Sequence, residues 1–352
     1  PPLRKLGGID HDPGIFPGKF LPLHRGHLAG ILQAHTLVDR LVVVLSWGPE
    51  DDAICLRDGL RRPISEVQRK QWLRQELQGF ENIDVRSVDE STVPPFPGGW
   101  EEWALRVQEA VGEPIDLIFG GEPEYAVSFR HFFPGAQYVM VDPHRGQWNI
   151  SGTSIRKNPL RYWDFICGSA RPFFVQKILV SGTESTGKTT LVKKLAKIFH
   201  TSWSEEVGRY YAQQHLGGDE TIFTPMDFAR MAHLQYEEDY KAMRTANRVV
   251  FFDTDAVVTN YYSELYMGAR NPRVGAFVDP ARYDVTFLLT PSVPWVPDGQ
   301  RIHGAEPERW RLHAMLRRMY EEYGFSPVVE VSGNYNERFS TVYNAVFDMY
   351  TP

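Results

Sequence analysis

One stretch in the middle of the chain constrains the fold more than any other. It consists of Gly182-Thr183-Glu184-Ser185-Thr186-Gly187-Lys188-Thr189. Two glycines frame four residues, and a lysine and a hydroxyl residue follow, which is the pattern of a P-loop. Glycines let the backbone N–H groups turn toward one centre, and the following helix directs its positive end there. The stretch therefore predicts a polyphosphate site.

Each part of this loop has an expected role. Lys188 is expected to reach the β- and γ-phosphates of a nucleotide, and Thr189 to ligand Mg²⁺. The other residues of the loop, and Thr190 after it, are expected to contact ATP. Residues 174–180 are predicted to form the buried strand that enters the loop, and apolar residues recur at helical spacing over 191–198. The alternative is a turn that only joins a strand to a helix.

The bulk properties limit the class of protein. A chain of 352 residues is long for one domain and comfortable for two. A net charge of −6 and a pI of ≈ 6.0 argue against a general nucleic-acid binder. Cys55 and Cys167 give neither a disulfide framework nor zinc spacing, and they suit a reducing cytosol. Because no apolar run approaches the ~20 residues that cross a bilayer, we expect a cytoplasmic protein.

The half of the chain that precedes the P-loop alternates strands with helices. This order predicts a parallel α/β sheet that binds ligands at the carboxyl ends of its strands. The expected strands are 15–20, 41–45, 83–88, 115–119 and 137–141. A boundary is expected near 160–172, which divides the chain into domains 1–170 and 171–352.

The segment His24-Arg25-Gly26-His27 lies at a predicted strand-to-helix turn, where phosphates commonly bind. Two histidines three apart at a helix start point the same way, and their ring N–H groups can hold the bridging oxygens of a triphosphate. Lys19 adds a cation. The alternatives are a pair of surface histidines, or a zinc site for which no third ligand is close in sequence.

A second segment, Ile150-Ser151-Gly152-Thr153-Ser154-Ile155-Arg156, follows downstream. Ser151 and Thr153 suit a helix N-cap, and the N–H groups of the first helical turn can bind phosphate. We expect Arg156 to bind the β- and γ-phosphates.

Together, the two segments resemble the HxGH nucleotidylyltransferase superfamily, whose second motif is I-S-x-T-x-x-R. The resemblance implies transfer of AMP from ATP with pyrophosphate as leaving group. It assigns His24, His27 and Arg156 to the triphosphate and gives Lys19 a supporting role. Gly18 and Phe20, which flank Lys19, are expected to contact ATP with Ser151 and Thr153. No side chain need act as a general base, since a substrate phosphate is already nucleophilic.

The acceptor of the nucleotidyl group is suggested by residues 94–103, P-P-F-P-G-G-W-E-E-W. A tryptophan after two glycines, Trp100, can stack on a flat aromatic cation such as nicotinamide. The alternative is that Trp100 packs against the next helix, as we expect of Trp103.

Beyond the P-loop helix, residues 203–211 read W-S-E-E-V-G-R-Y-Y. Small-molecule kinases of this architecture place an acidic residue here, where it meets the acceptor hydroxyl. Glu206 is therefore a candidate catalytic residue, and Arg209 a candidate substrate contact. The alternative for each is a solvated, charged helix start.

An apolar strand then ends in Asp253-Thr254-Asp255. This is the Walker B arrangement, in which the carboxylate, here Asp253, organises Mg²⁺ near the substrate. Asp255 is a candidate for binding ribose hydroxyls or for accepting the proton of the attacking 5′-hydroxyl. A strand-end aspartate is also often only a helix N-cap.

A loop rich in proline and glycine follows the next strand. It contains Trp295, Asp298 and Arg301. In nucleoside and nucleotide kinases a mobile lid brings an arginine onto the transferring phosphoryl group. Arg301 fits that role, Asp298 is expected to order the loop, and both Trp295 and Asp298 are candidate substrate contacts. The alternative is an ordinary surface loop.

Taken together, the chain resembles the bifunctional nicotinamide mononucleotide adenylyltransferase/ribosylnicotinamide kinase (NadR-type) family over essentially its whole length. The resemblance is carried by G-K-F-L-P-L-H-R-G-H, I-S-G-T-S-I-R, G-T-E-S-T-G-K-T, E-V-G-R-Y-Y, H-L-G-G-D-E, D-T-D and P-W-V-P-D-G-Q-R, in this order. Some members also carry an N-terminal helix-turn-helix. Only about fifteen residues precede the first predicted strand, so we expect this chain to lack that module and DNA binding.

The resemblance implies a fold class and a set of small-molecule partners. The fold is α/β, with an N-terminal Rossmann-like HxGH nucleotidylyltransferase domain and a C-terminal P-loop kinase domain, both built on parallel sheets. The ligands are ATP, Mg²⁺, ribosylnicotinamide, nicotinamide mononucleotide and the product NAD. We expect no membrane partner, and the sequence leaves a homo-oligomer open.

Two alternative functions stay open at this point. One is a fused pantetheine-phosphate adenylyltransferase and dephospho-coenzyme A kinase, which uses the same two chemistries. The other is a non-catalytic sensor of nicotinamide nucleotides that regulates a partner.

Overall fold

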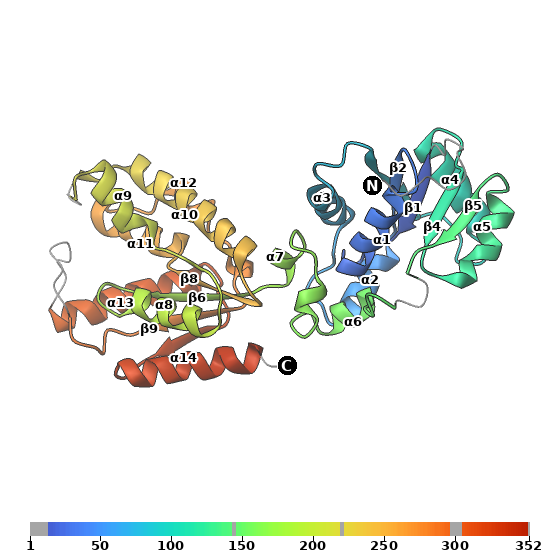
Figure 1. The fold of residues 1–352 in the computed structure, drawn as a ribbon. Helices are drawn as coiled ribbons and strands as arrows, with labels where there is room; N and C mark the ends of the chain where they lie inside the picture. Colours follow the sequence, from blue (N-terminus) through green and yellow to red (C-terminus); the bar gives the residue numbers. More distant parts are fainter. Residues whose placement is uncertain (1–12, 143–145, 219–221, 296–304, 351–352) are drawn as a thin grey trace. The chain divides into compact units, whose positions relative to one another are not determined.

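The chain folds into two compact units, Pro1–Phe173 and Phe174–Pro352, in the computed structural model (Figure 1). The structure describes residues 13–142, 146–218, 222–295 and 305–350. Over these ranges, none of the helices combines the length and the apolar character that crossing a bilayer requires.

The first unit is built on a five-stranded sheet in the order β3-β2-β1-β4-β5, with every pair parallel. Its strands are β1 (Gly14–Gly18), β2 (Leu41–Trp47), β3 (Ile83–Asp89), β4 (Leu117–Gly120) and β5 (Gln137–Met140). Its α-helices are α1 (Arg25–His35), α2 (Glu50–Arg57), α3 (Glu66–Glu76), α4 (Trp100–Val111), α5 (Ala126–Phe132), α6 (Gly152–Lys157) and α7 (Arg171–Phe174), the last of which crosses the boundary between the units. The strand order reverses between β1 and β4, and ligands of open parallel sheets bind at such a point.

Helices cover both faces of this sheet because alternate residues of each strand point to opposite sides. Ile15 of β1 packs in a core cluster with residues of α4 and α5. Its neighbour Phe16 faces α1, where a ring carbon lies 3.1 Å from the position that a Cβ of Gly30 would occupy. Figure 1 shows α1 and the α4–α5 pair on opposite sides of the sheet. Gly30 thus permits the close approach of α1 to β1.

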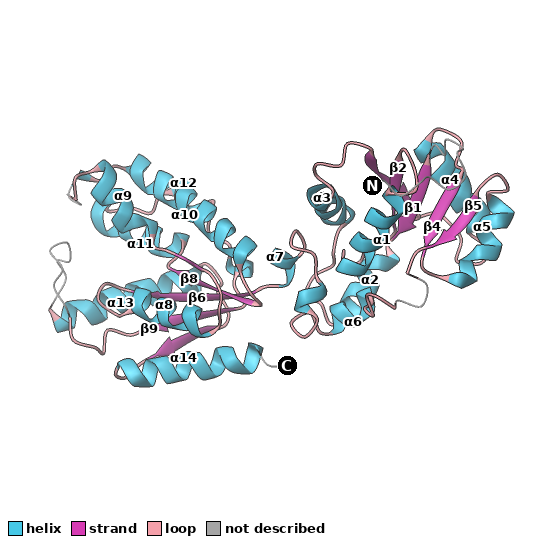
Figure 2. Ribbon diagram, in the orientation of Figure 1, coloured by secondary structure: helices cyan, strands magenta, loops and turns pink. Residues whose placement is uncertain are grey.

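The second unit is also a five-stranded parallel sheet, in the order β10-β9-β6-β8-β7 (Figure 2). Its strands are β6 (Gln176–Gly182), β7 (Trp203–Ser204), β8 (Val249–Asp253), β9 (Val285–Leu289) and β10 (Val328–Val331). Its helices are α8 (Lys188–Ile198), α9 (Val207–His215), α10 (Pro225–Thr245), α11 (Ala256–Met267), α12 (Pro272–Gly275), α13 (Glu306–Glu322) and α14 (Tyr335–Tyr350). The central strand β6 leads directly into the P-loop.

One face of the second sheet carries a large apolar core. Val180, Phe251 and Phe287, from three neighbouring strands, pack there with Leu195 of α8 and Val342 of α14. Figure 1 shows α10 and α11 on the side of the sheet away from α14. The P-loop therefore joins the middle strand to a helix that is buried along one side, and its ends are fixed.

The predicted α/β class with two parallel sheets is confirmed. The strands predicted at 285–289 and 328–331 coincide with β9 and β10. The strand that enters the P-loop begins two residues later than predicted, at Gln176, because Arg171–Phe174 form the short helix α7. At the start of β6 the backbone N–H of Lys177 donates to the Asp284 carboxylate at 2.6 Å, and its ammonium group donates to the carbonyl of Val175 at 3.2 Å.

Candidate active sites

The first unit has a cavity at the carboxyl ends of β1 and β4. Its lining includes Gly18, Lys19, His24, Gly26, His27, Ser46, Glu90, Trp100, Trp103, Gly120, Tyr125, Trp148 and Gly152. The cavity lies where the strand order reverses, which is the expected ligand position for this fold.

The two predicted histidines lie side by side at the start of α1. His24 is the N-cap residue, and its Nδ1 accepts the backbone N–H of His27 at 3.3 Å. The rings stack with centroids 3.6 Å apart and planes at 18°. The prediction that both side chains point the same way is confirmed. For the zinc alternative, no group of three or more metal-ligating side chains is found within the described ranges.

Phe20 packs against this histidine pair and does not line the cavity. Its ring meets that of His27 edge to face, with centroids 5.1 Å apart. The backbone of Phe20 has φ 48°, a left-handed conformation that is uncommon for an aromatic residue. In the structure Phe20 therefore supports His27, whereas the sequence had suggested a contact with ATP.

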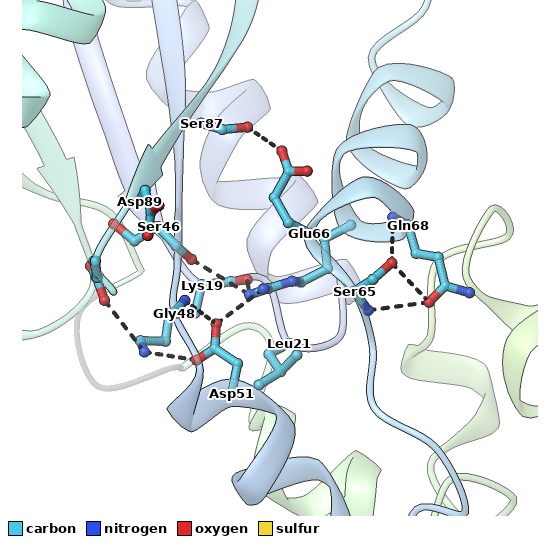
Figure 3. A network of polar contacts seen from close by, with 12 residues as sticks. Lys19, Leu21, Ser46, Gly48, Asp51, Ser65, Glu66, Gln68, Ser87 and Asp89 are labelled. Atoms are coloured by element: carbon cyan, nitrogen blue, oxygen red, sulfur yellow. Dashed lines mark hydrogen bonds and ion pairs between the residues drawn. The ribbon is translucent and has the colours of Figure 1, made fainter. Parts of the chain in front are cut away.

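Lys19 lies at the cavity within a network of charges (Figure 3). Its Nζ is 2.8 Å from Oδ1 of Asp51 and 3.5 Å from Oε2 of Glu90. Arg69 pairs with the other oxygen of Asp51 at 3.0 Å and donates to the carbonyl of Lys19 at 2.8 Å. Burial lowers the pKa of Lys19, but Asp51 and Glu90 outweigh it and leave the pKa above its usual value. Lys19 is thus held as a cation.

The structure differs from the expectation for Arg156. Its guanidinium is buried, and it forms an ion pair with Asp58 at 2.7 Å and donates to the carbonyl of Leu21. Arg156 is not among the residues that line the cavity. A buried guanidinium requires a charge partner and acceptors, and the protein itself supplies them. Arg156 therefore fixes the segment after β1 in this structure, and its role at the triphosphate stays a prediction.

Ser151 and Thr153 have separate roles. Ser151 caps α6, since its Oγ accepts the N–H of Ser154 at 3.1 Å. This prediction is confirmed. Thr153 lies inside the helix and accepts a hydrogen bond from Arg156 at 3.1 Å, so it is not the cap. Of this segment, Ile150 and Gly152 line the cavity.

Trp100 is part of an aromatic cluster at the cavity wall. Its ring lies edge to face with Phe96, Trp103 and Tyr125, with centroids 5.1–5.6 Å apart. Trp103 is 5% exposed and donates its Nε1–H to the Ser46 hydroxyl, as expected of a core residue. Trp100 is only half-buried and borders the cavity, so it is available for a flat ligand.

The second unit has a cavity over the P-loop. Its lining includes Glu184 to Thr190 of the loop and α8, Glu206, Arg209, Phe223, Phe228, Gln235, Thr254, Tyr262 and Tyr266. The P-loop gives the lining polar groups, and the rings of Phe223, Phe228, Tyr262 and Tyr266 add an aromatic part to it. An anionic chain and a flat ring can therefore occupy it together.

The P-loop has the backbone form that binds phosphates. Ser185 and Gly187 adopt positive φ angles of 55° and 88°, and α8 starts directly after Gly187. The Lys188 ammonium lies over the loop and donates to the carbonyl of Thr183 at 3.2 Å. The hydroxyl of Thr186 donates to the same carbonyl at 2.8 Å. Contacts within the loop thus hold it in this form.

Arg338 of α14 supports the P-loop, and no motif in the sequence indicates this role. It is 2% exposed and donates to the carbonyls of Thr186 and Thr290, both at 2.6 Å. It also donates to the carbonyl of Gly333 at 2.9 Å. These acceptors are neutral, and burial lowers the pKa of Arg338 below its usual value. Its charge therefore adds to the positive field of the loop.

Asp253 lies at the end of β8 and is 1% exposed. Burial and the nearby Glu206 carboxylate raise its pKa to about 6, while Lys188 and Thr189 act to lower it. Among the described residues, the Thr189 hydroxyl is the hydrogen-bonding group that acts on this carboxylate, and neither oxygen has a partner of full hydrogen-bond geometry. A buried carboxylate without such a partner, next to the Thr189 hydroxyl, has the ligand chemistry that Mg²⁺ prefers. The residues present therefore fit a bound Mg²⁺.

Asp255 is not placed where the sequence suggested. Its Oδ1 caps α11 by accepting the N–H of Val258 at 3.2 Å, and it accepts the Tyr320 hydroxyl at 2.7 Å. The side chain is 2% exposed and does not line the cavity. Burial raises its pKa to about 7. The helix-cap interpretation is therefore the one that the structure supports, and a role at a substrate hydroxyl is not.

Glu206 and Arg209 both line the cavity, at the start of α9 and within its first turn. Gln235 of α10, which the sequence analysis missed, holds this region in place. Its Oε1 accepts the N–H of Val207 at 3.0 Å, and its Nε2 donates to the carbonyl of Glu205 at 3.1 Å.

The loop after β9 is described only in part. Asp298 and Arg301 lie outside the described residues. Trp295 is described, and it does not line either cavity. Its predicted role as a substrate contact thus has no support from the cavity lining.

Comparisons with known proteins agree with this architecture. A family model described as an AAA domain matches residues 177–338. The chain is 36% identical over 342 residues to the trifunctional NAD biosynthesis/regulator protein NadR of Escherichia coli (strain K12), which covers 96% of this chain and 83% of that protein. A crystal structure of a NadR protein in complex with NR has a TM-score of 0.79 and 29% identity, and it covers 96% of each chain. A second, in complex with NAD and AMP-PNP, has a TM-score of 0.78 with the same identity and coverage.

The fold and the two cavities define a nucleotide-binding enzyme of two α/β units, one with a histidine turn and one with a P-loop. The similarity extends over nearly the whole chain and is not confined to either unit. The chain belongs to the NadR family.

Proposed function

We propose that the chain makes NAD in two ATP-dependent steps, one in each unit. The second unit phosphorylates ribosylnicotinamide to nicotinamide mononucleotide, and the first unit transfers AMP from ATP to that product. The observation that carries the proposal is the similarity to NadR proteins over 96% of the chain, which includes both cavities. The complexes of the solved relatives, with NR and with NAD and AMP-PNP, support these ligand classes.

In the kinase step, the 5′-oxygen of the riboside attacks the γ-phosphorus of ATP. The bond from that phosphorus to the β–γ bridging oxygen breaks, and ADP leaves. We assign Glu206 as acceptor of the hydroxyl proton because it is a carboxylate that lines the cavity beside the P-loop. Lys188 balances the charge of the β- and γ-phosphates, and Arg209 is proposed to bind the acceptor.

Thr189 and Asp253 are the residues that would hold Mg²⁺. When bound, the ion neutralises charge on the β- and γ-phosphates. Thr189 is an exposed residue in the first turn of α8, Asp253 is the last residue of β8, and their side chains interact.

In the adenylyl transfer, a phosphate oxygen of nicotinamide mononucleotide attacks the α-phosphorus of ATP. The bond to the α–β bridging oxygen breaks, pyrophosphate leaves, and NAD forms. His24 and His27 are proposed to donate to the triphosphate as charge builds on the leaving group, and Lys19 supplies a fixed cation. Trp100 and its aromatic neighbours provide a surface for the nicotinamide ring.

The test is incubation of the protein with ATP, Mg²⁺ and ribosylnicotinamide while both the mononucleotide and NAD are followed. We expect ADP and the mononucleotide to form first, and NAD and pyrophosphate afterwards. A parallel reaction with dephospho-coenzyme A in place of the riboside tests the alternative enzyme. Turnover of that compound without turnover of the riboside would overturn the proposal, and no turnover of either would favour a sensor.

A further inference from the structure

Thr254 stands between the two aspartates of the D-T-D segment, in an unusual backbone conformation. Its φ is 87°, which is a genuine outlier for a β-branched residue. Its N–H donates to the carbonyl of Val180 at 3.3 Å, which ties it to the strand that leads into the P-loop. Strained conformations of this kind persist where the surrounding structure enforces them, and they cluster at functional sites.

The side chains of Asp253, Thr254 and Asp255 lie in three different surroundings. Asp255 faces the interior, where it caps α11 and meets Tyr320. Asp253 is buried at the end of β8. Thr254 is the member of the segment that lines the cavity.

The buried hydroxyl of Thr254 lacks a hydrogen-bond partner among the described residues. The residue is 4% exposed, and its Oγ1 forms no hydrogen bond with any residue that the structure describes. A buried hydroxyl without a partner destabilises the protein, and natural proteins rarely keep one unless a ligand or water satisfies it. The position of Thr254 in the wall of the cavity makes a ligand the natural partner.

The surroundings identify the chemistry of that ligand. The Thr254 hydroxyl can both donate and accept, and so can a sugar hydroxyl. The P-loop provides for phosphates in the lining of the cavity. The same lining holds the rings of Tyr262 and Tyr266, which stack with centroids 5.9 Å apart, and Phe223, which stacks on Tyr266. A ribosyl group between the phosphates and a flat ring would reach Thr254.

We propose that Thr254 binds a ribosyl hydroxyl of the phosphoryl acceptor and thereby sets the preference of the second unit for ribosides. This inference rests on the proposed kinase function. It assigns the contact with ribose to Thr254 in place of Asp255, whose side chain is directed into the interior.

The first test compares Thr254→Val with Thr254→Ser. Valine keeps the β-branch and the shape but removes the hydroxyl, whereas serine keeps the hydroxyl. We expect kcat/KM for ribosylnicotinamide to fall about 10- to 100-fold in Thr254→Val, with less loss in Thr254→Ser. We expect the KM for ATP and the adenylyl transfer of the first unit to stay within about twofold in both variants, since neither involves this hydroxyl.

Thermal stability separates a ligand contact from a structural role. Valine removes an unsatisfied hydroxyl from the unliganded protein, so the Tm of Thr254→Val should be unchanged or higher. A lower Tm with a loss of activity would show that the hydroxyl supports the fold, and it would overturn the proposal. Wild-type activity of Thr254→Val with ribosylnicotinamide would overturn it as well.

A second test removes the hydroxyl from the substrate. Ribosides that lack the 2′- or the 3′-hydroxyl are compared in the wild type and in Thr254→Val. The analogue without the contacted hydroxyl should be a poorer substrate of the wild type and equally poor for the variant. If, for both analogues, the loss from the missing hydroxyl multiplied with the loss from Thr254→Val, the proposed contact would be wrong. If the wild type phosphorylates no riboside at all, the proposed function itself fails, which is distinct from these outcomes.

Discussion

The side-chain amide of Gln235 bonds to the backbone on both sides of Glu206. Its Nε2 donates to the carbonyl of Glu205 at 3.1 Å, and its Oε1 accepts the N–H of Val207 at 3.0 Å. Asp239 in turn accepts from Gln235 at 2.9 Å and is paired with Arg282 at 3.2 Å. A chain of buried polar contacts thus fixes the backbone of Glu206, whose carboxylate we assign as the proton acceptor in the kinase.

We therefore predict that Gln235→Leu lowers kcat for riboside phosphorylation about 10-fold with a smaller effect on the KM for ATP. Steady-state kinetics of both substrates measure this. In a Glu206→Gln background, Gln235→Leu should cause little further loss, because its effect acts through Glu206. If Gln235→Leu lowered kcat by the same factor in the wild type and in the Glu206→Gln background, Gln235 would not act by positioning Glu206.

The two cavities lie in separate units, so single substitutions should separate the two activities. Lys188→Ala removes the cation of the P-loop and should reduce phosphorylation about 100-fold or more without affecting adenylyl transfer. His27→Ala should do the reverse, since it removes a donor to the triphosphate in the first unit. Each activity is measured with its own substrate, and circular dichroism checks the fold. A folded variant that lost both activities would contradict the assignment of one site to each unit.

These two substitutions concern motifs that the sequence revealed, because a P-loop or a histidine turn is a short, local pattern. The contacts that complete the sites are not local. Arg156 pairs with Asp58 across 98 residues, and Arg338 reaches Thr186 across 152 residues. No spacing rule connects residues so far apart, so the sequence suggested a phosphate partner for Arg156 and nothing for Arg338.

The D-T-D segment shows a second limit of sequence analysis. Its composition indicates a metal site and a catalytic site, but which side chain faces the cavity depends on backbone angles. The positive φ of Thr254 turns that residue to the cavity, and Asp255 points into the interior. The backbone conformation of Thr254 thus places a different residue at the cavity from Asp255, which the sequence pattern indicates.

From this placement we predict that Asp255→Asn keeps most of the kinase activity. The Oδ1 of asparagine can accept from both Tyr320 and Val258, as the carboxylate does. We expect kcat to stay within about threefold of the wild type, whereas Asp253→Asn should lose about 100-fold by weakening Mg²⁺ binding. Kinetics across a Mg²⁺ titration compare the two variants. An equal loss of kcat in both variants would show that Asp255 belongs to the catalytic site.

Arg338 leads to a prediction for nucleotide binding. Lysine carries the same charge but lacks the planar set of donors that reaches the carbonyls of Thr186, Thr290 and Gly333 together. Arg338→Lys should therefore raise the KM for ATP in the kinase reaction about 10-fold and leave the adenylyl transfer unchanged. The matched control is Arg317→Lys, which changes an exposed arginine paired with Glu321 at 3.1 Å and should have no effect.

Asp239 leads to a prediction for pH dependence. Burial raises its pKa from 3.8 to about 6, although Arg282, Ser204 and Gln235 act to lower it. Because the folded state holds the proton more tightly than the unfolded state does, this group makes the free energy of unfolding fall as the pH rises from about 4 to about 6. The full effect corresponds to about 3 kcal/mol.

Asp239→Asn removes this titration. The free energy of unfolding of the wild type should fall relative to that of the variant between pH 4.5, where the wild-type carboxyl is protonated, and pH 6.5. Urea unfolding of the whole chain at both pH values, followed by circular dichroism, measures the two differences. A stability difference that stayed constant or grew with pH would mean that Asp239 is ionised in the folded state throughout this range. The pair with Arg282 would then outweigh burial, and Gln235 would be held by a permanent charge.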